Sequence, residues 1–83
     1  MSKKNSIDSI NTKLIDIIAK RLKIKPSKIS PHFQLSKLGA DSFQILEIIY
    51  DIEVTFQLEQ LASDDFYKTK TIHDIANMIN HYG

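Results

Sequence analysis

Residues 38–53 read LGADSFQILEIIYDIE: a glycine turn, then a polar pair, then a run with helical periodicity. Asp41 and Gln44 have the spacing of a capping box, in which each side chain accepts a hydrogen bond from the other residue's backbone N–H. Ser42 therefore falls on the first turn of the predicted helix, and we expect its hydroxyl to point into solvent. Unpaired N–H groups and the positive end of the helix dipole favour an anion there, so this serine is suited to carry a phosphodiester.

The composition describes one small globular domain, residues 1–83. Hydrophobic residues make up 42% of the chain and charged residues 25%, which is ordinary for such a domain. The chain has no cysteine, which excludes a disulfide framework and a cysteine zinc site. No apolar run is long enough to span a bilayer and the N-terminus does not resemble a signal peptide, so we expect a cytoplasmic protein.

The net charge of +1 hides a strong asymmetry along the chain. Residues 1–37 hold nine basic residues against two acidic ones, whereas residues 38–67 hold seven acidic residues and no basic one. An acidic surface around the helix after Ser42 would attract basic partners. The basic run within residues 20–28 is compatible with nucleic-acid binding, although such runs are most often solvated faces.

Apolar residues recur at steps of three and four, which predicts an all-α fold: a small bundle of three main helices and one short helix. The predicted helices cover about residues 6–22, from 41 or 42 to 56 or 57, the short segment 63–67, and a last helix capped by Thr71. We expect Ser6 to cap the first helix, Tyr82 to close the last, and residues 1–5 to be frayed. The inward stripes are Ile7, Ile10, Leu14, Ile17, Ile18 and Leu22; then Ile45, Ile48, Ile49, Ile52 and Phe56; then Ile72, Ile75, Ala76 and Ile79.

The connection between the first two main helices, residues 23–40, is long for so small a domain. Pro26 and Pro31 argue against a continuous helix, although residues 26–29 could form one helical turn. The segment is also too apolar for a solvated linker. We therefore predict a loop pinned to the core by apolar side chains, namely Ile24, Ile29, Phe33, Leu35 and Leu38.

The helix after Ser42 has more apolar positions than one core-facing stripe needs. Phe43, Leu46 and Tyr50 form a second strip at steps of three and four, flanked by the acidic Glu47, Asp51 and Glu53, and we expect Glu47 and Asp51 to be exposed. An exposed apolar strip rimmed by charge is typical of a docking surface, and we predict that partner proteins dock on Phe43, Leu46, Glu47, Tyr50 and Asp51. The alternative is that Phe43 and Tyr50 only cover the ends of the core.

Catalysis by the chain itself has no support in the sequence. The candidate bases, His32, His73 and His81, all lie far from Ser42 in the sequence, and no nucleophile elbow is present. The histidine spacing does not suit a metal site, and Gly39 is the only internal glycine, which excludes a glycine-rich phosphate loop. We therefore expect no enzymatic activity and no bound metal.

The segment from Leu38 to Ser42 resembles the phosphopantetheine attachment motif of acyl carrier proteins, which is usually written L-G-x-D-S-L. Further residues stand where that family places similar ones, and the likeness extends over about residues 7–79. These residues are Leu22, Lys23, Ile24, Ile29, Phe33, Glu47, Phe56, Thr71, Ile72, Asp74 and Ile75. The resemblance implies that a phosphopantetheinyl transferase attaches 4′-phosphopantetheine from coenzyme A to Ser42. Asp41 would support presentation of the site to the transferase and its metal ion.

The resemblance also implies a free-standing, monomeric carrier that shuttles thioester-bound acyl groups between acyl-transferring or synthase enzymes. Fatty-acid synthesis, a polyketide or other specialised acyl pathway, and aminoacyl transfer to cell-wall polymers all use such carriers. Ala40 favours acyl cargo, and the basic first third together with Phe43 favours a specialised carrier. The alternative function is an unmodified helical module that binds protein, or binds nucleic acid through residues 13–28.

Overall fold

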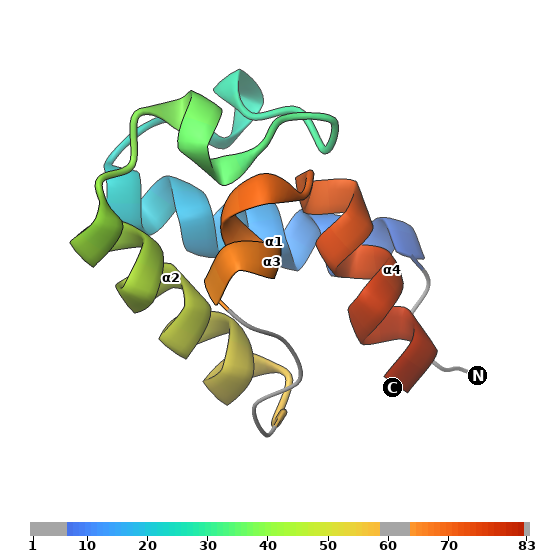
Figure 1. Ribbon diagram of the computed structural model, residues 1–83. Coiled ribbons are helices and arrows are strands. Elements are labelled where there is room, and N and C mark those ends of the chain that lie inside the picture. Colours follow the sequence, from blue (N-terminus) through green and yellow to red (C-terminus); the bar gives the residue numbers. More distant parts are fainter. Residues whose placement is uncertain (1–6, 59–63, 83) are drawn as a thin grey trace.

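The computed structural model describes residues 7–58 and 64–82, and only the backbone of residues 64, 65 and 82. The described residues form six helical elements and one isolated bridge, between Gln34 and Thr71. The elements are α1 (Ile7–Leu22), η1 (Pro26–Lys28), η2 (Leu35–Leu38), α2 (Ser42–Thr55), α3 (Asp64–Thr69) and α4 (Ile72–Tyr82). α1 packs against both α2 and α4, while the connection that holds the 3-10 helices η1 and η2 crosses over the bundle (Figure 1). The predicted all-α bundle is confirmed.

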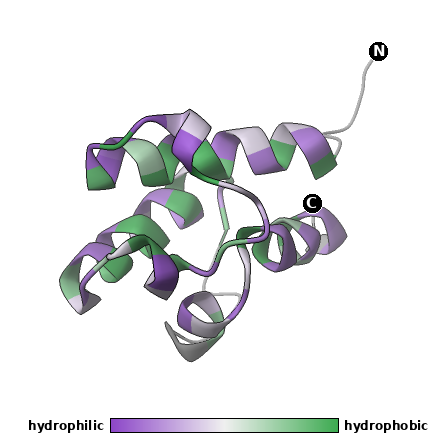
Figure 2. Ribbon diagram, turned by 90° about the horizontal axis from the view of Figure 1, so that it is seen from above, coloured by the Kyte–Doolittle hydropathy of each residue, from purple (hydrophilic) through white to green (hydrophobic). Residues whose placement is uncertain are grey.

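The core consists of the apolar stripes predicted from periodicity, and isoleucine dominates it. Its buried members are Ile10, Leu14, Ile18, Ile45, Ile48, Ile49, Ile52, Ile72, Ile75, Ala76 and Ile79, together with Ala19, Ile29, Leu35 and Tyr67. Hydrophobic and hydrophilic residues alternate along the helices, as expected of helices with one buried face (Figure 2). Four residues predicted to face inward are only half-buried, because they lie at the ends or margins of their stripes: Ile7, Ile17, Leu22 and Phe56.

Some predictions concern residues outside the described part of the chain. These are the frayed residues 1–5, the cap at Ser6 and the predicted first residue of the short helix, Ser63. The side chain of Tyr82 lies outside the described part as well. The predicted cap of α4 lies inside it and is confirmed. The Thr71 hydroxyl accepts from the Asp74 amide at 3.0 Å, and the Asp74 carboxylate accepts from the Thr71 amide at 3.3 Å.

The connection between α1 and α2 is pinned by fewer side chains than predicted. Ile29 and Leu35 are buried and Leu38 is half-buried, which confirms those three anchors. Ile24 and Phe33 are exposed by 37% and 42%, so the prediction that they are anchors is wrong. The helical turn expected near Pro26 is present as η1, whereas η2, which holds Leu35, was not predicted.

Backbone hydrogen bonds to α4 hold the connection where side chains do not. The Ile72 amide donates to the Phe33 carbonyl at 2.9 Å, and the His73 amide donates to the Pro31 carbonyl at 2.7 Å. The first amides of a helix lack acceptors within the helix, so α4 gains partners that its own backbone does not supply. Phe33 therefore anchors the connection through its carbonyl, while its ring remains exposed.

Tyr67 of α3 is a fully buried core residue whose burial was not predicted. Its side chain is 0% exposed, and its hydroxyl finds no hydrogen-bond partner among the described residues. Burial raises the pKa of the Tyr67 phenol, and the negative charge of Glu53 raises it further. A buried hydroxyl without a partner costs free energy, because the unfolded chain can hydrogen-bond the same group to water.

We expect Tyr67→Phe to stabilise the fold by about 1 kcal/mol at neutral pH, since it removes the unpaired hydroxyl and keeps the ring. The folded state holds the phenol proton more tightly than the unfolded state. The wild type should therefore lose stability as pH rises above about 10, and the variant should lack that loss.

Urea unfolding at neutral and alkaline pH measures both effects of Tyr67→Phe. Tyr50→Phe, at a side chain that is 64% exposed, is the control and should change stability little. A destabilised Tyr67→Phe variant would show that the hydroxyl has a partner.

Candidate functional site

The entrance of α2 places Ser42 at the surface. Gly39 adopts the left-handed conformation, with φ of 83°, and ends η2 just before α2 begins. A non-glycine residue would be strained at this φ, so the glycine is needed for the turn. Ser42 is the first residue of α2 and is exposed. Its predicted position, a hydroxyl at the mouth of a helix, agrees with the structure.

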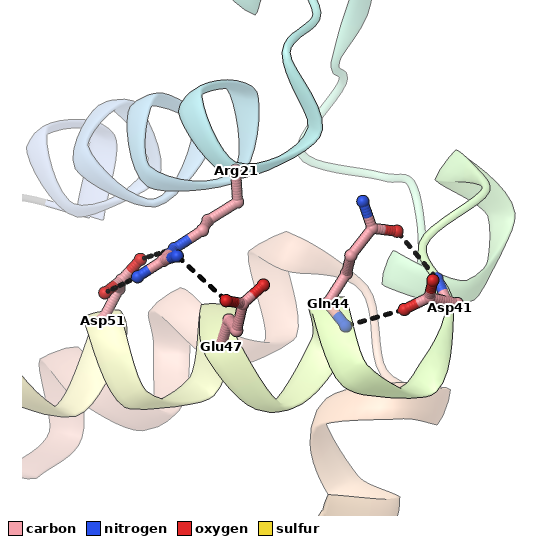
Figure 3. A network of polar contacts seen from close by, with 5 residues as sticks. All are labelled: Arg21, Asp41, Gln44, Glu47 and Asp51. Atoms are coloured by element: carbon pink, nitrogen blue, oxygen red, sulfur yellow. Dashed lines mark hydrogen bonds and ion pairs between the residues drawn. The ribbon is translucent and has the colours of Figure 1, made fainter.

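A complete capping box spans Ser42, with Asp41 before it and Gln44 after it. The Gln44 amide donates to Asp41 Oδ1 at 2.8 Å, and the Asp41 amide donates to Gln44 Oε1 at 3.0 Å (Figure 3). Asp41 Oδ2 accepts no hydrogen bond from any residue within 7–58 or 64–82. One carboxylate oxygen of Asp41 therefore fixes the helix start, and the other is available to an outside group.

The two helix entrances differ in how their first amides are used. At α4 the amides of Ile72, His73 and Asp74 all donate to acceptors from the connection or the cap. At α2 the Gln44 amide is capped, but the amides of Ser42 and Phe43 find no acceptor in the described part of the chain. Two unpaired donors beside an exposed hydroxyl, at the positive end of a helix, form a favourable position for an anion attached to Ser42.

Arg21 of α1 binds both acidic residues predicted for the docking surface. Its Nε and Nη2 donate to the two oxygens of Asp51 at 2.5 and 3.0 Å, and its Nη1 donates to Glu47 Oε2 at 3.2 Å (Figure 3). The Asp51 and Glu47 side chains are 27% and 34% exposed. Our expectation of two freely exposed acids is therefore wrong, because an arginine from the neighbouring helix engages both. No periodicity within one helix could have indicated a pair that links two helices.

The pair with Arg21 changes the ionisation of Asp51. The hydrogen bonds from Arg21 lower the pKa of the Asp51 carboxyl, with partial burial acting in the opposite direction and the Arg21 charge adding to the lowering. The same bonds raise the pKa of Arg21. Because the folded pKa of Asp51 lies below its unfolded value, the pair stabilises the fold above about pH 4 and loses that contribution as the pH falls through the folded pKa.

We expect Arg21→Gln to return the pKa of Asp51 towards its ordinary value of about 3.9. Titration of the side-chain carboxyl by NMR measures this directly. Between about pH 5 and pH 2, the free energy of unfolding should also fall less in the variant than in the wild type. In the wild type, protonation of a carboxyl whose folded pKa is depressed destabilises the fold over this range. Lys20→Gln is the control, since Lys20 pairs with Asp16 instead, at 3.5 Å. An unchanged Asp51 titration in Arg21→Gln would show that the pair does not form in solution.

The outer face of α2 carries an apolar strip that starts next to Ser42. Phe43, Leu46, Tyr50 and Val54 are exposed by 67%, 48%, 64% and 58%. Phe43 and Tyr50 are too exposed to serve as covers for the ends of the core, which removes that alternative. Val54 was not predicted, although its step of four from Tyr50 continues the strip. This face is the exposed apolar surface that a docking site requires.

The histidines and the basic run are the other candidate groups. The rings of His32 and His73 lie 6.3 Å apart, and Asn11 Nδ2 lies 3.4 Å from His73 Nδ1. Residues 7–58 and 64–82 contain no cluster of three potential metal ligands. In the basic run, Lys20 and Arg21 are already paired with acids of this chain. None of the helices in the described ranges combines the length and hydropathy needed to cross a bilayer.

Comparison with known proteins agrees with this site. A family model described as the phosphopantetheine attachment site matches residues 12–79. No curated protein and no solved structure matches the chain significantly. The matched span covers most of the 83 residues and contains the whole entrance of α2 with the exposed Ser42. The chain therefore belongs to the family of acyl-carrier-like domains to which 4′-phosphopantetheine is covalently attached.

Proposed function

We propose that Ser42 is the residue that carries 4′-phosphopantetheine, with Asp41 in a supporting role. The observation behind this assignment is an exposed serine at the first position of α2, beside two amides that lack acceptors in the described part of the chain. A phosphodiester on Ser42 would place its negative charge where those amides and the helix dipole favour it. The residues present thus fit the group.

Each residue at the entrance has a separate task. Asp41 Oδ1 and Gln44 hold the first turn of α2 in one conformation, so that Ser42 is presented in a constant position. Asp41 Oδ2 is available to the transferase and its metal ion. Ser42 makes no hydrogen bond with a histidine or carboxylate among the described residues, so the transferase is expected to supply the base that accepts the hydroxyl proton.

The carrier role follows from this attachment. The bound group supplies a terminal thiol that holds an acyl group as a thioester. The chain supplies a tether that raises the effective concentration of the acyl group at each enzyme that docks. Phe43, Leu46, Glu47, Tyr50 and Asp51 form the proposed docking patch for the transferase and for acyl-transferring or synthase enzymes. A small patch of this kind suits docking that must also release.

We further propose a monomeric, cytoplasmic, non-catalytic carrier with one domain, which meets its enzymes as separate proteins. Its pathway is fatty-acid synthesis, polyketide synthesis or another specialised acyl pathway. Mass spectrometry of the protein purified from its native cell would identify the acyl group directly. That measurement distinguishes the pathways without assuming any of them.

Incubation of the apo protein with coenzyme A and a phosphopantetheinyl transferase tests the function. We expect the intact mass to rise by that of one phosphopantetheine, and peptide mapping to locate the added group on Ser42. Omission of coenzyme A is the control and should leave the mass unchanged. Modification at a different residue would contradict the site, and no modification with an active transferase would contradict the carrier function.

A further inference from the structure

The connection between α1 and α2 carries four positive charges that the described part of the protein does not neutralise. Four of its lysines are exposed and form no ion pair with any residue in the described ranges: Lys23, Lys25, Lys28 and Lys37. The chain has no acidic residue between Asp16 and Asp41. Asp41 and Asp74 cap the helices next to the connection, and their two charges do not cancel those of four lysines. This side of the molecule is therefore net positive.

The backbone of the connection is held in place. Ile29 and Leu35 bury their side chains in the core, and the carbonyls of Pro31 and Phe33 accept hydrogen bonds from the first amides of α4. In Figure 1 the connection lies across one side of the bundle, above α1. A surface that binds without first ordering its backbone avoids that cost in conformational entropy.

Lys23 occupies a position where the backbone favours a different residue. Its φ is 59°, directly after the last residue of α1, and the Ile24 amide donates to the Ala19 carbonyl at 3.1 Å. Glycine or asparagine is usual at such a helix end, because other side chains are strained there. Lys20 and Arg21 already supply positive charge to the last turn of α1, so the helix dipole does not require a third cation. The lysine is thus retained at a cost in backbone strain, which suggests a use for its charge.

Two exposed apolar side chains belong to the same segment. Ile24 and Phe33 are exposed by 37% and 42%, and Ile24 stands between two of the free lysines in the sequence. A lysine can lay its apolar stem along such groups while its ammonium group stays in water. Free ammonium groups combined with exposed apolar side chains suit the headgroup region of a bilayer. There the charges meet phosphates, and the apolar groups reach the boundary of the acyl chains.

The residue types favour a lipid surface over a nucleic acid. All four free cations are lysines, and the only arginine of the chain, Arg21, is bound to Asp51 and Glu47. Arginine binds bases and phosphates through paired hydrogen bonds, whereas lysine acts as a point charge. Ile24 has no aromatic face on which a base can stack. An anionic bilayer requires only positive charge and apolar contact, and the connection supplies both.

We propose that residues 23–37 dock on the surface of a bilayer that contains anionic phospholipids. The four lysines meet the lipid phosphates, and Ile24 and Phe33 enter the headgroup region. Four lysines are at the low end of what lipid-binding basic clusters contain, so the contact is weak and reversible. The connection leads directly into the entrance of α2, so a docked protein would hold Ser42 close to the lipid headgroups. Binding by this surface does not require attachment of a group to Ser42.

Flotation of the unmodified protein with lipid vesicles tests the proposal. One vesicle type is pure phosphatidylcholine, and the other contains about 30% phosphatidylglycerol, which makes its surface anionic. At about 50 mM NaCl, we expect the partition coefficient to be at least about tenfold higher on the anionic vesicles. At about 500 mM NaCl the two coefficients should converge, because the charges are screened. Equal partitioning onto both vesicle types at low salt, or binding to neither, would overturn the proposal.

Two triple variants with the same net charge locate the binding surface, each checked for an unchanged circular dichroism spectrum. The first removes three charges from the connection and should lower the partition coefficient on anionic vesicles about tenfold. It combines Lys23→Gln, Lys25→Gln and Lys28→Gln. The control removes three charges from α1 and α3 and should lower the coefficient by no more than about twofold. It combines Lys13→Gln, Lys20→Gln and Lys68→Gln. Equal losses would show that only net charge matters, and would overturn the assignment to the connection.

Single tryptophans report which surface meets the lipid, because the chain has no tryptophan of its own. The emission of Phe33→Trp should shift to the blue when anionic vesicles are added, since the ring leaves water. Tyr50→Trp is the matched control, at an exposed ring of α2, and should show no shift. A shift in Tyr50→Trp alone would assign the lipid surface to α2. That result, or vesicle binding without a shift in either variant, would overturn the proposal.

Competition with a short DNA duplex tests the other anionic partner. The duplex is added at the same phosphate concentration as the anionic lipid. The vesicle-bound fraction should stay within about twofold of its value without DNA, because only the lipid offers apolar contacts as well as charge. Transfer of the protein from the vesicles to the duplex would assign the connection to nucleic acid and overturn the proposal. Because the protein is unmodified in all these experiments, their outcomes are independent of the proposed attachment at Ser42.

Discussion

Replacing Ser42 by alanine is expected to abolish the gain of phosphopantetheine completely, while the fold remains intact. The hydroxyl is the atom to which the phosphodiester would be bonded, so its loss leaves no acceptor for the group. Ser42 is exposed at the first position of α2, and a surface substitution there should change the free energy of unfolding by no more than about 0.5 kcal/mol. Intact mass spectrometry after incubation with coenzyme A and a transferase measures the first effect, and urea unfolding measures the second.

Ser36→Ala is the matched control for this variant. Ser36 is also exposed and lies in η2, so this variant removes a serine hydroxyl six residues before the site in the sequence. This control should gain one phosphopantetheine at the wild-type rate. If Ser42→Ala still gained the group, the attachment residue would lie elsewhere and the role of the α2 entrance would be refuted.

Replacing Leu35 by alanine is expected to destabilise the protein by about 2–5 kcal/mol, the usual cost of deleting a buried leucine side chain. Leu35 is 0% exposed and belongs to the core, although it lies in the connection between α1 and α2. A domain of this length has a total stability of about 4–12 kcal/mol, so this loss would be a large fraction of it. The midpoint of urea unfolding should fall accordingly.

Leu46→Ala makes the identical chemical change at an exposed position of α2, where the side chain is 48% accessible. It should cost no more than about 0.5 kcal/mol. The difference between the two variants in free energy of unfolding therefore measures how much the packing of Leu35 on the core stabilises the protein. Equal and small losses would show that Leu35 is not an anchor and that the connection is held by its backbone hydrogen bonds alone.

Features that depend on residues a few positions apart were predictable. The capping box of Asp41 and Gln44, the cap at Thr71 and the isoleucine stripes were all predicted, and all are present. Each depends on the helical repeat or on a side chain that reaches a backbone amide three residues away. The exposed strip on α2 was predicted for the same reason, apart from its last member, Val54.

Features that join distant residues were not predictable from such patterns. The isoleucine stripes predicted which residues are buried, but not that Phe33 would hold the connection by its carbonyl and leave its ring exposed. Tyr67 lies in a helix of only six residues, too short for periodicity to indicate its buried face. Glu47 and Asp51 were predicted to flank the strip, yet their availability depended on an arginine in another helix.

The amino-acid sequence alone determined the main helices, the caps of α2 and α4 and the position of Ser42 at the start of α2, because local spacing is enough to specify them. Only the tertiary structure decided which charges remain available. Arg21 lies 26 residues from Glu47 and 30 from Asp51, and the three meet only because α1 packs against α2. Charged groups form hydrogen bonds only where they lie within a few ångströms of each other in space. Their separation along the sequence does not show whether they do.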